Sequence, residues 1–304
     1  MAELNVVREE VFALYQRQDY DRVLEVAQSV ANEFPANASY WIACMLAVTD
    51  RPDEALAALE QGLERGAYWP SRMLLKDPDL ESIRADRRFA RIIQESERAW
   101  KSAFDPGPEI HAFPPTVEPS GVLVIALDGA PGASVEEFSL HWQSARDQGA
   151  LVVIPQSSQP HAPEGGRTWA DGQRTKADLA FVYQDVSKHH EFDPEKVVLA
   201  GFSQGGRVAI SIALRRDPIS ACGFIAVAPT VVDDPLTNEL DRQSNLRGSI
   251  TVGEDDWVLD AATSLHETAT ARGLSWRLDL VPRVAHEFPP DFDSRLLETL
   301  SFVA

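Results

Sequence analysis

Apolar residues in the first hundred positions recur at intervals of three and four residues. Val7, Val11 and Leu14 follow this spacing, and Leu56, Leu59 and their neighbours repeat it. Such spacing places apolar side chains along one face of a helix. Sequences typical of turns interrupt the pattern at 18–19, 35–37, 50–52 and 66. We therefore expect residues 1–104 to form a stack of short antiparallel helices.

An internal repeat is visible within this helical half. Residues 20–24 and 52–56 have similar patterns, and each opens a helix after a turn. Their separation is close to the roughly 34 residues of tetratricopeptide units. Residues 77–89 also resemble the segment that often closes such repeats. The resemblance implies a tetratricopeptide-like helical domain, with a generic helical bundle as the alternative.

Proline dominates the next stretch, residues 105–120. Five prolines lie in it, and helical periodicity is almost absent: Pro106, Pro108, Pro114, Pro115 and Pro119. Proline fixes the backbone torsion φ and removes an amide donor, which favours extended chain. We expect a linker or a sheet-edge segment here, at the boundary between two domains.

Short apolar runs alternate with helical patterns after Gly121. Strands are expected at 122–127, 151–154, 197–200, 223–228, 249–252 and 276–281. Helices are expected at 135–147, 176–189, 204–215, 261–272 and 291–302. Continuous apolar strands separated by helices indicate a mostly parallel sheet covered on both faces. Residues 121–304 are thus predicted to form an α/β domain, which follows the all-α domain.

A strand-to-helix turn in this second half carries the clearest chemical signal. Residues 201–205 have the sequence Gly-Phe-Ser-Gln-Gly, between the strand expected at 197–200 and the helix expected at 204–215. In the G-x-S-x-G motif, the serine sits on a sharp strained turn and exposes its hydroxyl at the sheet edge. Glycine on either side lets the strand and helix approach. This context predicts that Ser203 is a nucleophile.

A nucleophilic serine needs a histidine base and a carboxylate that orients it. In chain order, the acid and then the histidine are expected after the serine. His286 follows the last predicted strand, whereas His266 lies inside a predicted helix, so we favour His286. Three carboxylates follow the strand at 249–252, and the Gly-x-x-Asp spacing selects Asp256, with Asp255 as its rival.

The oxyanion formed during acyl transfer requires two amide donors. The N–H of Gln204, directly after the nucleophile, is expected to supply one. The loop after the strand at 122–127 is expected to supply the other. Its best candidate is the N–H of Ala130, because Pro131 has none. A plain strand-to-helix turn is the alternative interpretation of this loop.

Three ordered motifs together resemble the α/β-hydrolase superfamily: residues 201–206, Gly253-x-x-Asp256, and the triplet 286–288. The most similar branch contains carboxylesterase and phospholipase-type esterases, with acyl-protein thioesterases and dienelactone-hydrolase-like enzymes as relatives. The resemblance implies serine-dependent hydrolysis of an acyl bond without a metal or organic cofactor. Residues 155–159 resemble the substrate-side loop of that branch, and Trp169 and Phe202 are the implied substrate contacts.

Two positions depart from the pattern of that family. Asp128 precedes Gly129 where such enzymes usually have histidine, and Ala285 stands where glycine often precedes the histidine. A carboxylate in the oxyanion loop opposes the developing negative charge unless it is turned away or paired. We expect these departures to affect catalytic efficiency rather than the mechanism.

Charge and cysteine content narrow the functional classes. With 28 basic and 47 acidic residues, the formal charge is −19, which disfavours nucleic acids and anionic membranes as partners. Cys44 and Cys222 are too few for a disulfide framework or a zinc cluster. No basic-then-apolar leader is apparent, so we expect a cytoplasmic location. The remaining histidines are expected to be structural or solvated: His111, His141, His161, His189 and His190.

The sequence therefore predicts a serine hydrolase that cleaves a carboxylic ester or thioester in a small-molecule or acylated substrate. Two alternatives remain open. One is an adaptor that has the hydrolase fold without turnover and binds a protein partner through its helical domain. The other is a serine peptidase of the prolyl-oligopeptidase type.

Overall fold

The periodic apolar residues of the first hundred positions form successive helices. A computed structural model of the chain describes residues 2–231, 240 and 246–304. The helices are α1 (Ala2–Gln16), α2 (Tyr20–Ser29), α3 (Pro35–Val48), α4 (Pro52–Glu64), α5 (Ser71–Lys76), the 3-10 helix η1 (Pro78–Ile83) and α6 (Arg87–Ser102). Their apolar faces meet in one core that includes Val23, Leu56, Leu59, Trp69 and Ile92.

Local sequence explains where these helices begin. The side chain of Asp19 accepts a hydrogen bond from the Arg22 backbone N–H and so caps α2. Pro35 and Pro52, which the sequence pattern placed in turns, are the first residues of α3 and α4. Proline suits that position because its missing N–H has no acceptor within the helix and its φ is already helical.

A β-hairpin from the middle of the chain completes the helical unit. This unit comprises residues 1–105 and 159–170, and the hairpin consists of β4 (Pro160–Ala162) and β5 (Gly165–Arg167). The Glu164 carboxylate accepts hydrogen bonds from the Ala36 N–H and the Asn37 side chain at the start of α3. The sequence prediction placed residues 159–170 in the second domain. In the structure, their polar and apolar contacts join them to the helices.

Two further contacts fix the hairpin in this unit. The Trp100 indole N–H donates to the Pro160 carbonyl at 2.7 Å, and Arg167 forms an ion pair with Asp105. The side chain of Ala162 is part of the helical core. The hairpin accepts hydrogen bonds from amides at a helix end and fills part of the core. Residues 1–105 therefore form a complete folded unit only together with residues 159–170.

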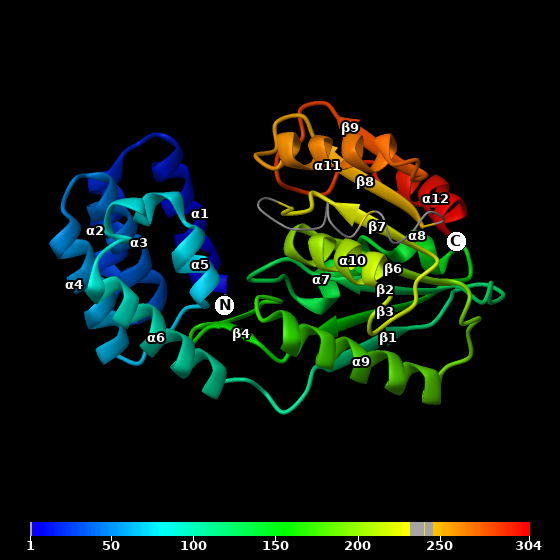
Figure 1. Cartoon of the computed structure of the whole chain (residues 1–304), viewed down its shortest axis with the longest axis horizontal. Helices are drawn as coiled ribbons and strands as arrows, with labels where there is room; N and C mark the ends of the chain where they lie inside the picture. Colours follow the sequence, from blue (N-terminus) through cyan, green and yellow to red (C-terminus); the bar gives the residue numbers. More distant parts are fainter. Residues whose placement is uncertain (1, 232–239, 241–245) are drawn as a thin grey trace. The chain divides into compact units, whose positions relative to one another are not determined.

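The second unit, residues 106–158 and 171–304, is built around a seven-stranded sheet. Its strand order is β1-β3-β2-β6-β7-β8-β9, as Figure 1 shows. The strands are β1 (Glu109–Phe113), β2 (Leu123–Leu127), β3 (Leu151–Gln156), β6 (Val197–Phe202), β7 (Gly223–Val227), β8 (Arg247–Gly253) and β9 (Trp276–Val281). All neighbours are parallel except β1, which runs antiparallel to β3.

Strand β1 lies within the proline-rich stretch that the sequence pattern predicted as a linker or edge segment. It pairs along β3 from Glu109 opposite Gln156 to Phe113 opposite Val152. An edge strand tolerates neighbouring prolines because one of its sides needs no amide donors. This part of 105–120 therefore belongs to the sheet of the second unit.

Helices cover the sheet and leave its carboxyl edge to the loops. They are α7 (Val135–Leu140), α8 (Gln143–Arg146), α9 (Gly172–His189), α10 (Ser203–Arg215), α11 (Leu259–Ala271) and α12 (Phe292–Val303). Helix α10 packs on β6 and β7, whereas α8 and α12 pack against each other. Every residue of β2 and β7 is buried, as expected for strands covered on both faces.

The bend from β6 into α10 and the loops after β8 and β9 lie at the same edge of the sheet because these strands are parallel. In the order β6-β7-β8-β9, a single strand separates the bend after β6 from the loop after β8. No helix among the described residues is long and apolar enough to cross a membrane.

The hairpin also carries a largely enclosed histidine, His161, that is expected to make the helical unit acid-sensitive. Burial lowers the pKa of His161 from 6.5 to about 4, and the positive charge of Arg8 acts in the same direction. Between these values the unfolded chain binds a proton that the folded chain does not. The free energy of unfolding should therefore decrease as pH falls through this window, by up to about 1.4 kcal/mol per pH unit.

Hydrogen–deuterium exchange of peptides from α1–α4, measured at pH 7 and pH 5, tests this expectation. His161→Gln should reduce the loss of protection at pH 5, because glutamine does not titrate. His189→Gln, at an exposed position of α9, is the matched control and should behave as wild type. Equal acid sensitivity in wild type and His161→Gln would contradict the assignment.

Candidate active site

Ser203 lies at the bend between β6 and α10, at the carboxyl edge of the sheet. It is the first residue of α10, is 8% exposed and has a φ of +51°. Positive φ is unfavourable for a residue with a side chain and is found where the surrounding structure enforces it. This conformation, the one expected of the serine in a G-x-S-x-G turn, turns the side chain out of the sheet edge.

The glycines of residues 201–205 are required by close backbone contacts. A Cβ on Gly205 would lie 2.1 Å from the Leu127 carbonyl oxygen at the end of β2, and one on Gly201 would lie 2.5 Å from the Gly205 carbonyl carbon. Neither contact can be relieved by moving a flexible side chain. The two glycines therefore let β2, β6 and α10 meet beneath Ser203, as the sequence pattern predicted.

Side chains from the bend after β6 and from the loops after β8 and β9 form a continuous hydrogen-bonded chain. Nε2 of His286 lies 2.9 Å from the Ser203 hydroxyl oxygen. Nδ1 of the same ring lies 2.9 and 3.0 Å from the two Asp256 carboxylate oxygens. An ionised carboxylate only accepts hydrogen bonds, so the ring proton belongs on Nδ1. The Nε2 lone pair then faces the serine hydroxyl.

The structure also distinguishes the two rival carboxylates. Asp256 is 5% exposed, and one of its oxygens accepts a further hydrogen bond from the Val258 N–H at 3.0 Å. Asp255 is exposed and contributes its backbone N–H to the Val284 carbonyl at 3.0 Å. Of these two carboxylates, it is Asp256 that contacts His286, and its role as the triad acid stays a prediction.

Contacts between the loops after β8 and β9 place Asp256 near His286. The Asp255 N–H to Val284 carbonyl hydrogen bond joins these loops. At Gly253, a Cβ would lie 1.9 Å from the Val284 oxygen, so only glycine permits this approach. The Gly-x-x-Asp spacing therefore has a structural cause, since its glycine packs against the loop that carries the histidine.

An aromatic stack holds the loop that follows His286. The Phe288 ring packs on Phe202 at a centroid distance of 4.9 Å and on His141 at 3.8 Å, nearly parallel to each. Burial lowers the pKa of His141, although Asp293 partly opposes this shift. The neutral form of the His141 ring packs on Phe288 without burying a charge against an apolar surface. The stack links α7 and the bend at Ser203 to the loop of His286.

Two aromatic rings flank the His286 imidazole. Phe202 and Trp257 each have a centroid 5.1 Å from it. Phe202, predicted as a substrate contact, lies next to His286. Its role in substrate binding stays a prediction. Trp257 was not predicted. The available signal was a large aromatic residue directly after the triad acid candidate.

The loop after β2 contains the carboxylate that departs from the family pattern. The Asp128 side chain accepts hydrogen bonds from the N–H groups of Gly129 and Ala133 within its own loop. Burial raises the pKa of Asp128, and these two amide bonds partly offset the effect. The Asp128 carboxylate is thus paired with backbone donors. Pairing is one of the two arrangements, the other being a side chain turned away, in which this carboxylate is not expected to oppose the oxyanion.

Of the two predicted amide donors, Ala130 belongs to this loop and Gln204 directly follows Ser203. Among the described residues, no backbone carbonyl accepts a hydrogen bond from the Ala130 N–H. Gln204 is in the first turn of α10, where N–H groups point along the helix axis. Gly129 packs against the bend, because a Cβ there would lie 3.2 Å from the Ser203 Cβ. The loop and the helix start thus meet beside the serine hydroxyl.

Trp169 lies in a different part of the fold. It is 3% exposed and belongs to the segment 159–170, which joins the helical unit. Just before that segment, Ser158 is buried, and both its N–H and its hydroxyl donate to the Asp178 carboxylate. The implied substrate role of Trp169 therefore stays a prediction.

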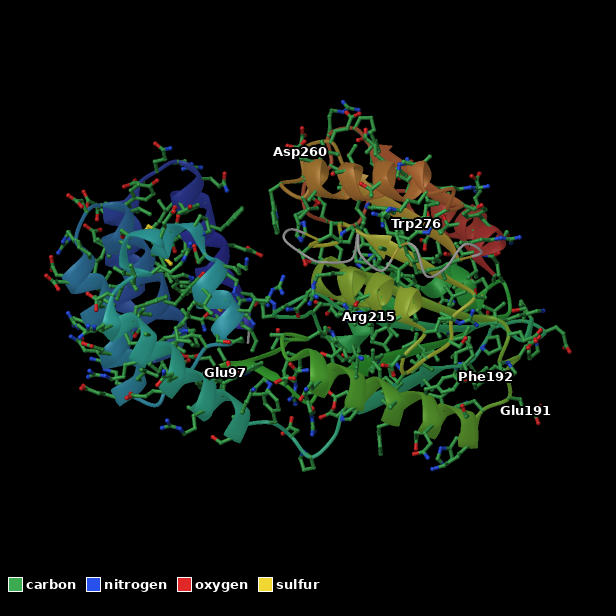
Figure 2. All side chains as sticks on the ribbon, viewed as in Figure 1. Glu97, Glu191, Phe192, Arg215, Asp260 and Trp276 are labelled. Carbon is green, nitrogen blue, oxygen red and sulfur yellow. The ribbon has the colours of Figure 1, made fainter. Side chains whose placement is uncertain are left out.

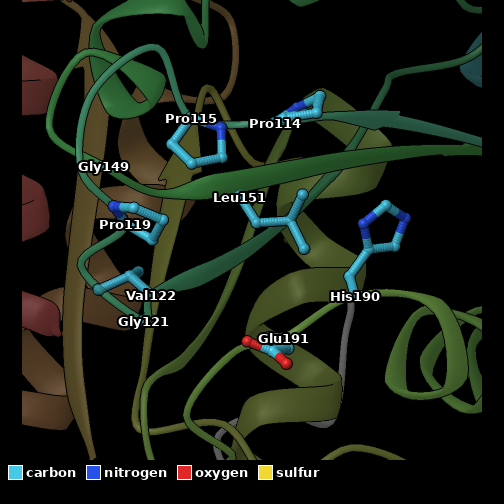
Figure 3. Close-up of a pocket in the computed structure, with 9 residues that line it drawn as sticks. All are labelled: Pro114, Pro115, Pro119, Gly121, Val122, Gly149, Leu151, His190 and Glu191. Atoms are coloured by element: carbon cyan, nitrogen blue, oxygen red, sulfur yellow. The ribbon is translucent and has the colours of Figure 1, made fainter.

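Two other groups of residues are candidate sites. A small pocket is lined by prolines, His190 and Glu191 next to the amino-terminal ends of β2 and β3, opposite the edge that carries Ser203 (Figure 3). In the helical unit, donor atoms of Cys44, Asp77 and Asp79 lie within 4.8 Å of one another. Asp77 and Asp79 accept hydrogen bonds from Tyr40 and Tyr15, and Asp77 caps η1, so these side chains have structural partners.

Comparison with known proteins gives one curated relative with a related sequence. No known protein-family pattern matches the chain. Over 105 residues, or 33% of this chain, the sequence is 31% identical to the bifunctional acetylxylan esterase/xylanase XynS20E of Neocallimastix patriciarum. The match spans 15% of the length of that relative.

Solved structures show the same fold at low sequence identity. An uncharacterised protein from Bacillus cereus has a TM-score of 0.55 and 22% identity, covering 98% of this chain and 97% of its own. Esterase PE8 has a TM-score of 0.53 and 19% identity, covering 65% and 100%. Acyl-protein thioesterase 2 of Zea mays has a TM-score of 0.52 and 16% identity, covering 63% and 99%.

These structural neighbours share the fold of the second unit. The mixed α/β architecture with a mostly parallel central sheet, predicted from the sequence, is confirmed. The second unit has the α/β-hydrolase fold.

If the Asp128 carboxylate organises the loop, its removal should impair ester hydrolysis. Asp128→Ala leaves two loop amides without their acceptor, so we expect kcat to fall by about tenfold or more with little change in KM. Asp260→Ala, on the outer side of α11 (Figure 2), removes an exposed carboxylate and should match wild type. Faster hydrolysis by Asp128→Ala would instead mean that the carboxylate opposes the oxyanion.

Proposed function

We propose that the protein is a serine hydrolase that cleaves a carboxylic ester or thioester through an acyl-enzyme intermediate. The observation that carries this proposal is the 2.9 Å contact between His286 Nε2 and the Ser203 hydroxyl oxygen. A hydroxyl is a weak nucleophile until an adjacent base takes its proton as it attacks. The ring orientation set by Asp256 presents the unprotonated nitrogen for this step.

Acylation uses each member of the hydrogen-bonded chain. The Ser203 oxygen attacks the acyl carbonyl carbon while its proton moves to His286 Nε2. Asp256 stabilises the imidazolium that forms and remains ionised. The tetrahedral intermediate collapses when its bond to the leaving oxygen or sulfur breaks, and Nε2 protonates the departing group. The acyl group is then bound to Ser203 as an ester.

Deacylation repeats these steps with water. His286 removes a proton from a water molecule, whose oxygen attacks the acyl-enzyme carbonyl. The proton returns to the Ser203 oxygen as the acid product leaves. In both tetrahedral intermediates, the N–H groups of Gln204 and Ala130 are proposed to donate to the oxyanion. A donor of this kind contributes on the order of 3 kcal/mol to transition-state stabilisation.

The comparisons support an ester as the bond that is cleaved. The curated relative is described as an acetylxylan esterase, and one structural neighbour is described as an esterase. A third protein with this fold is described as an acyl-protein thioesterase, which keeps a thioester within the proposal. A small-molecule or acylated substrate in the cytoplasm fits this chemistry.

We further propose that the helical unit is tetratricopeptide-like and binds a protein partner. Helix α2 begins at Tyr20 and α4 at Pro52, at the two positions where the sequence repeat predicted helix starts. Successive contacts of α1 with α2, α2 with α3 and α3 with α4 are typical of stacked helical hairpins.

Hydrolysis of p-nitrophenyl acetate and an acetyl thioester tests the proposed mechanism. Ser203→Ala and His286→Ala should each lower kcat by at least about a thousandfold while the protein remains folded. Asp256→Asn should also lower kcat strongly, because the asparagine amide stabilises the wrong imidazole tautomer. The ratio of the two wild-type rates shows whether an ester or a thioester is preferred.

Matched variants separate this mechanism from a general loss of structure. Ser211→Ala removes an equally buried hydroxyl from α10, and Asp255→Asn neutralises the rival carboxylate. Both should retain activity within about threefold of wild type, as for substitutions outside the reacting groups.

Full activity in Ser203→Ala would refute the proposal. Absence of hydrolysis by wild type, together with a captured protein partner, would favour an adaptor. Faster cleavage of aminoacyl anilides would favour a peptidase.

A further inference from the structure

One large aromatic side chain beside His286 is exposed to solvent. Trp257 is 66% exposed, and its ring lies 5.1 Å from the imidazole at an interplanar angle of 37°. Its neighbours Asp256 and Val258 are both buried, and a hydrogen bond between the Asp256 carboxylate and the Val258 N–H tightens the turn. The chain is thus anchored on each side of Trp257 while the indole faces outward.

Exposure of an indole has a free-energy cost that burial would remove, since it presents a large apolar surface to water. Packing within the described residues does not explain this position, because the ring contributes little to the core. The neighbouring Phe202 and Phe288, in contrast, are stacked and partly buried. Trp257 therefore offers a surface that a bound molecule can cover.

The position of Trp257 indicates which part of a substrate meets it. In the proposed mechanism, His286 Nε2 protonates the leaving oxygen, so that oxygen must lie beside the imidazole. Trp257 is a neighbour of that same imidazole. The group attached to the leaving oxygen, which is the alcohol part of an ester, thus reaches the indole more readily than a remote part of a long acyl chain does.

The charges on the same two loops restrict the alcohol. The exposed carboxylates of Glu254, Asp255 and Glu287 lie on these loops. They outnumber the exposed guanidinium of Arg283, three residues before His286. Carboxylates repel an anionic leaving group and accept hydrogen bonds from hydroxyl groups. A neutral polyhydroxylated alcohol fits these surroundings, whereas a phosphorylated one does not.

A sugar ring satisfies both requirements. One face of a pyranose carries C–H groups that pack on a flat aromatic ring, and its edge carries hydroxyl groups. A quaternary ammonium alcohol is usually enclosed by several aromatic rings. Here Trp257 is exposed, whereas Phe202 and Phe288 stack on each other and do not enclose a cation together with the indole.

We propose that the indole of Trp257 is the stacking surface for the alcohol part of the substrate and that this alcohol is a sugar, so that the enzyme deacylates saccharide esters. This inference rests on the proposed serine hydrolase function. The reaction transfers the acyl group from the sugar oxygen to Ser203, and the sugar hydroxyl receives its proton from His286. Water then releases the acid. The description of the curated relative as an acetylxylan esterase is consistent with this substrate class.

Two acetyl esters with different alcohols test the proposal. We would measure kcat/KM of wild type, Trp257→Ala and Trp257→Phe on acetylated methyl xyloside and on ethyl acetate, with a pH-stat. Trp257→Ala should lower kcat/KM on the xyloside by about tenfold, mainly through KM, because one aromatic contact is lost. Ethyl acetate hydrolysis should change by less than about twofold, since ethanol has no face to stack. Trp257→Phe should retain part of the preference.

A control variant and a binding measurement complete the test. Phe181→Ala, on α9, removes another exposed aromatic ring and should keep the wild-type ratio of the two substrates. Titration of the acetylated xyloside into Ser203→Ala and into Ser203→Ala/Trp257→Ala should show weaker binding in the double variant, without any need for turnover.

Several results would overturn the inference. An unchanged substrate ratio in Trp257→Ala, with both esters cleaved, would exclude the indole from alcohol recognition and leave the hydrolase proposal intact. A Trp257-dependent preference for acetylcholine over the xyloside would assign the surface to a cation. If wild type cleaves neither these esters nor p-nitrophenyl acetate, the hydrolase proposal and the inference both fail.

Discussion

The left-handed backbone conformation of Ser203 is the constraint on which the rest of the site depends. Such a φ costs a residue with a side chain about 1 kcal/mol or more, which the surrounding packing must offset. Gly201 and Gly205 make that packing feasible, because the end of β2 leaves no space for a Cβ at either position. The same contacts bring the loop of Asp128 beside the helix start. One bend therefore places a hydroxyl at the sheet edge, with the loop that follows β2 packed next to it.

The parallel sheet supplies the partners of that hydroxyl. Strands β8 and β9 end at the same edge as β6, and their loops are joined by a backbone hydrogen bond and by close packing at Gly253. His286 and Asp256 thus meet although the chain separates them. The stacked ring of Phe288 then ties the histidine loop to Phe202, next to the serine. Backbone contacts and aromatic packing, rather than the polar side chains alone, determine the geometry.

Patterns with a local cause were visible in the sequence. Apolar periodicity predicted the alternating strands and helices of the second unit, and β9 has the predicted bounds. Motif spacing predicted that Ser203, His286 and Asp256 come together. The hairpin of β4 and β5 was not predicted, because its three-residue strands show no periodicity and its binding to distant helices leaves no local signal. The exposure of Trp257 also depends on the packing of its neighbours, which spacing does not reveal.

The most direct test of the account is covalent labelling of the serine by a fluorophosphonate probe, located by mass spectrometry of the digested protein. This reagent reports an activated hydroxyl and requires no knowledge of the natural substrate. We expect one equivalent of label on Ser203, slower labelling in His286→Ala and none in Ser203→Ala, with Ser211→Ala labelled as wild type. Label on another residue, or wild-type protein that stays unlabelled while folded, would contradict it.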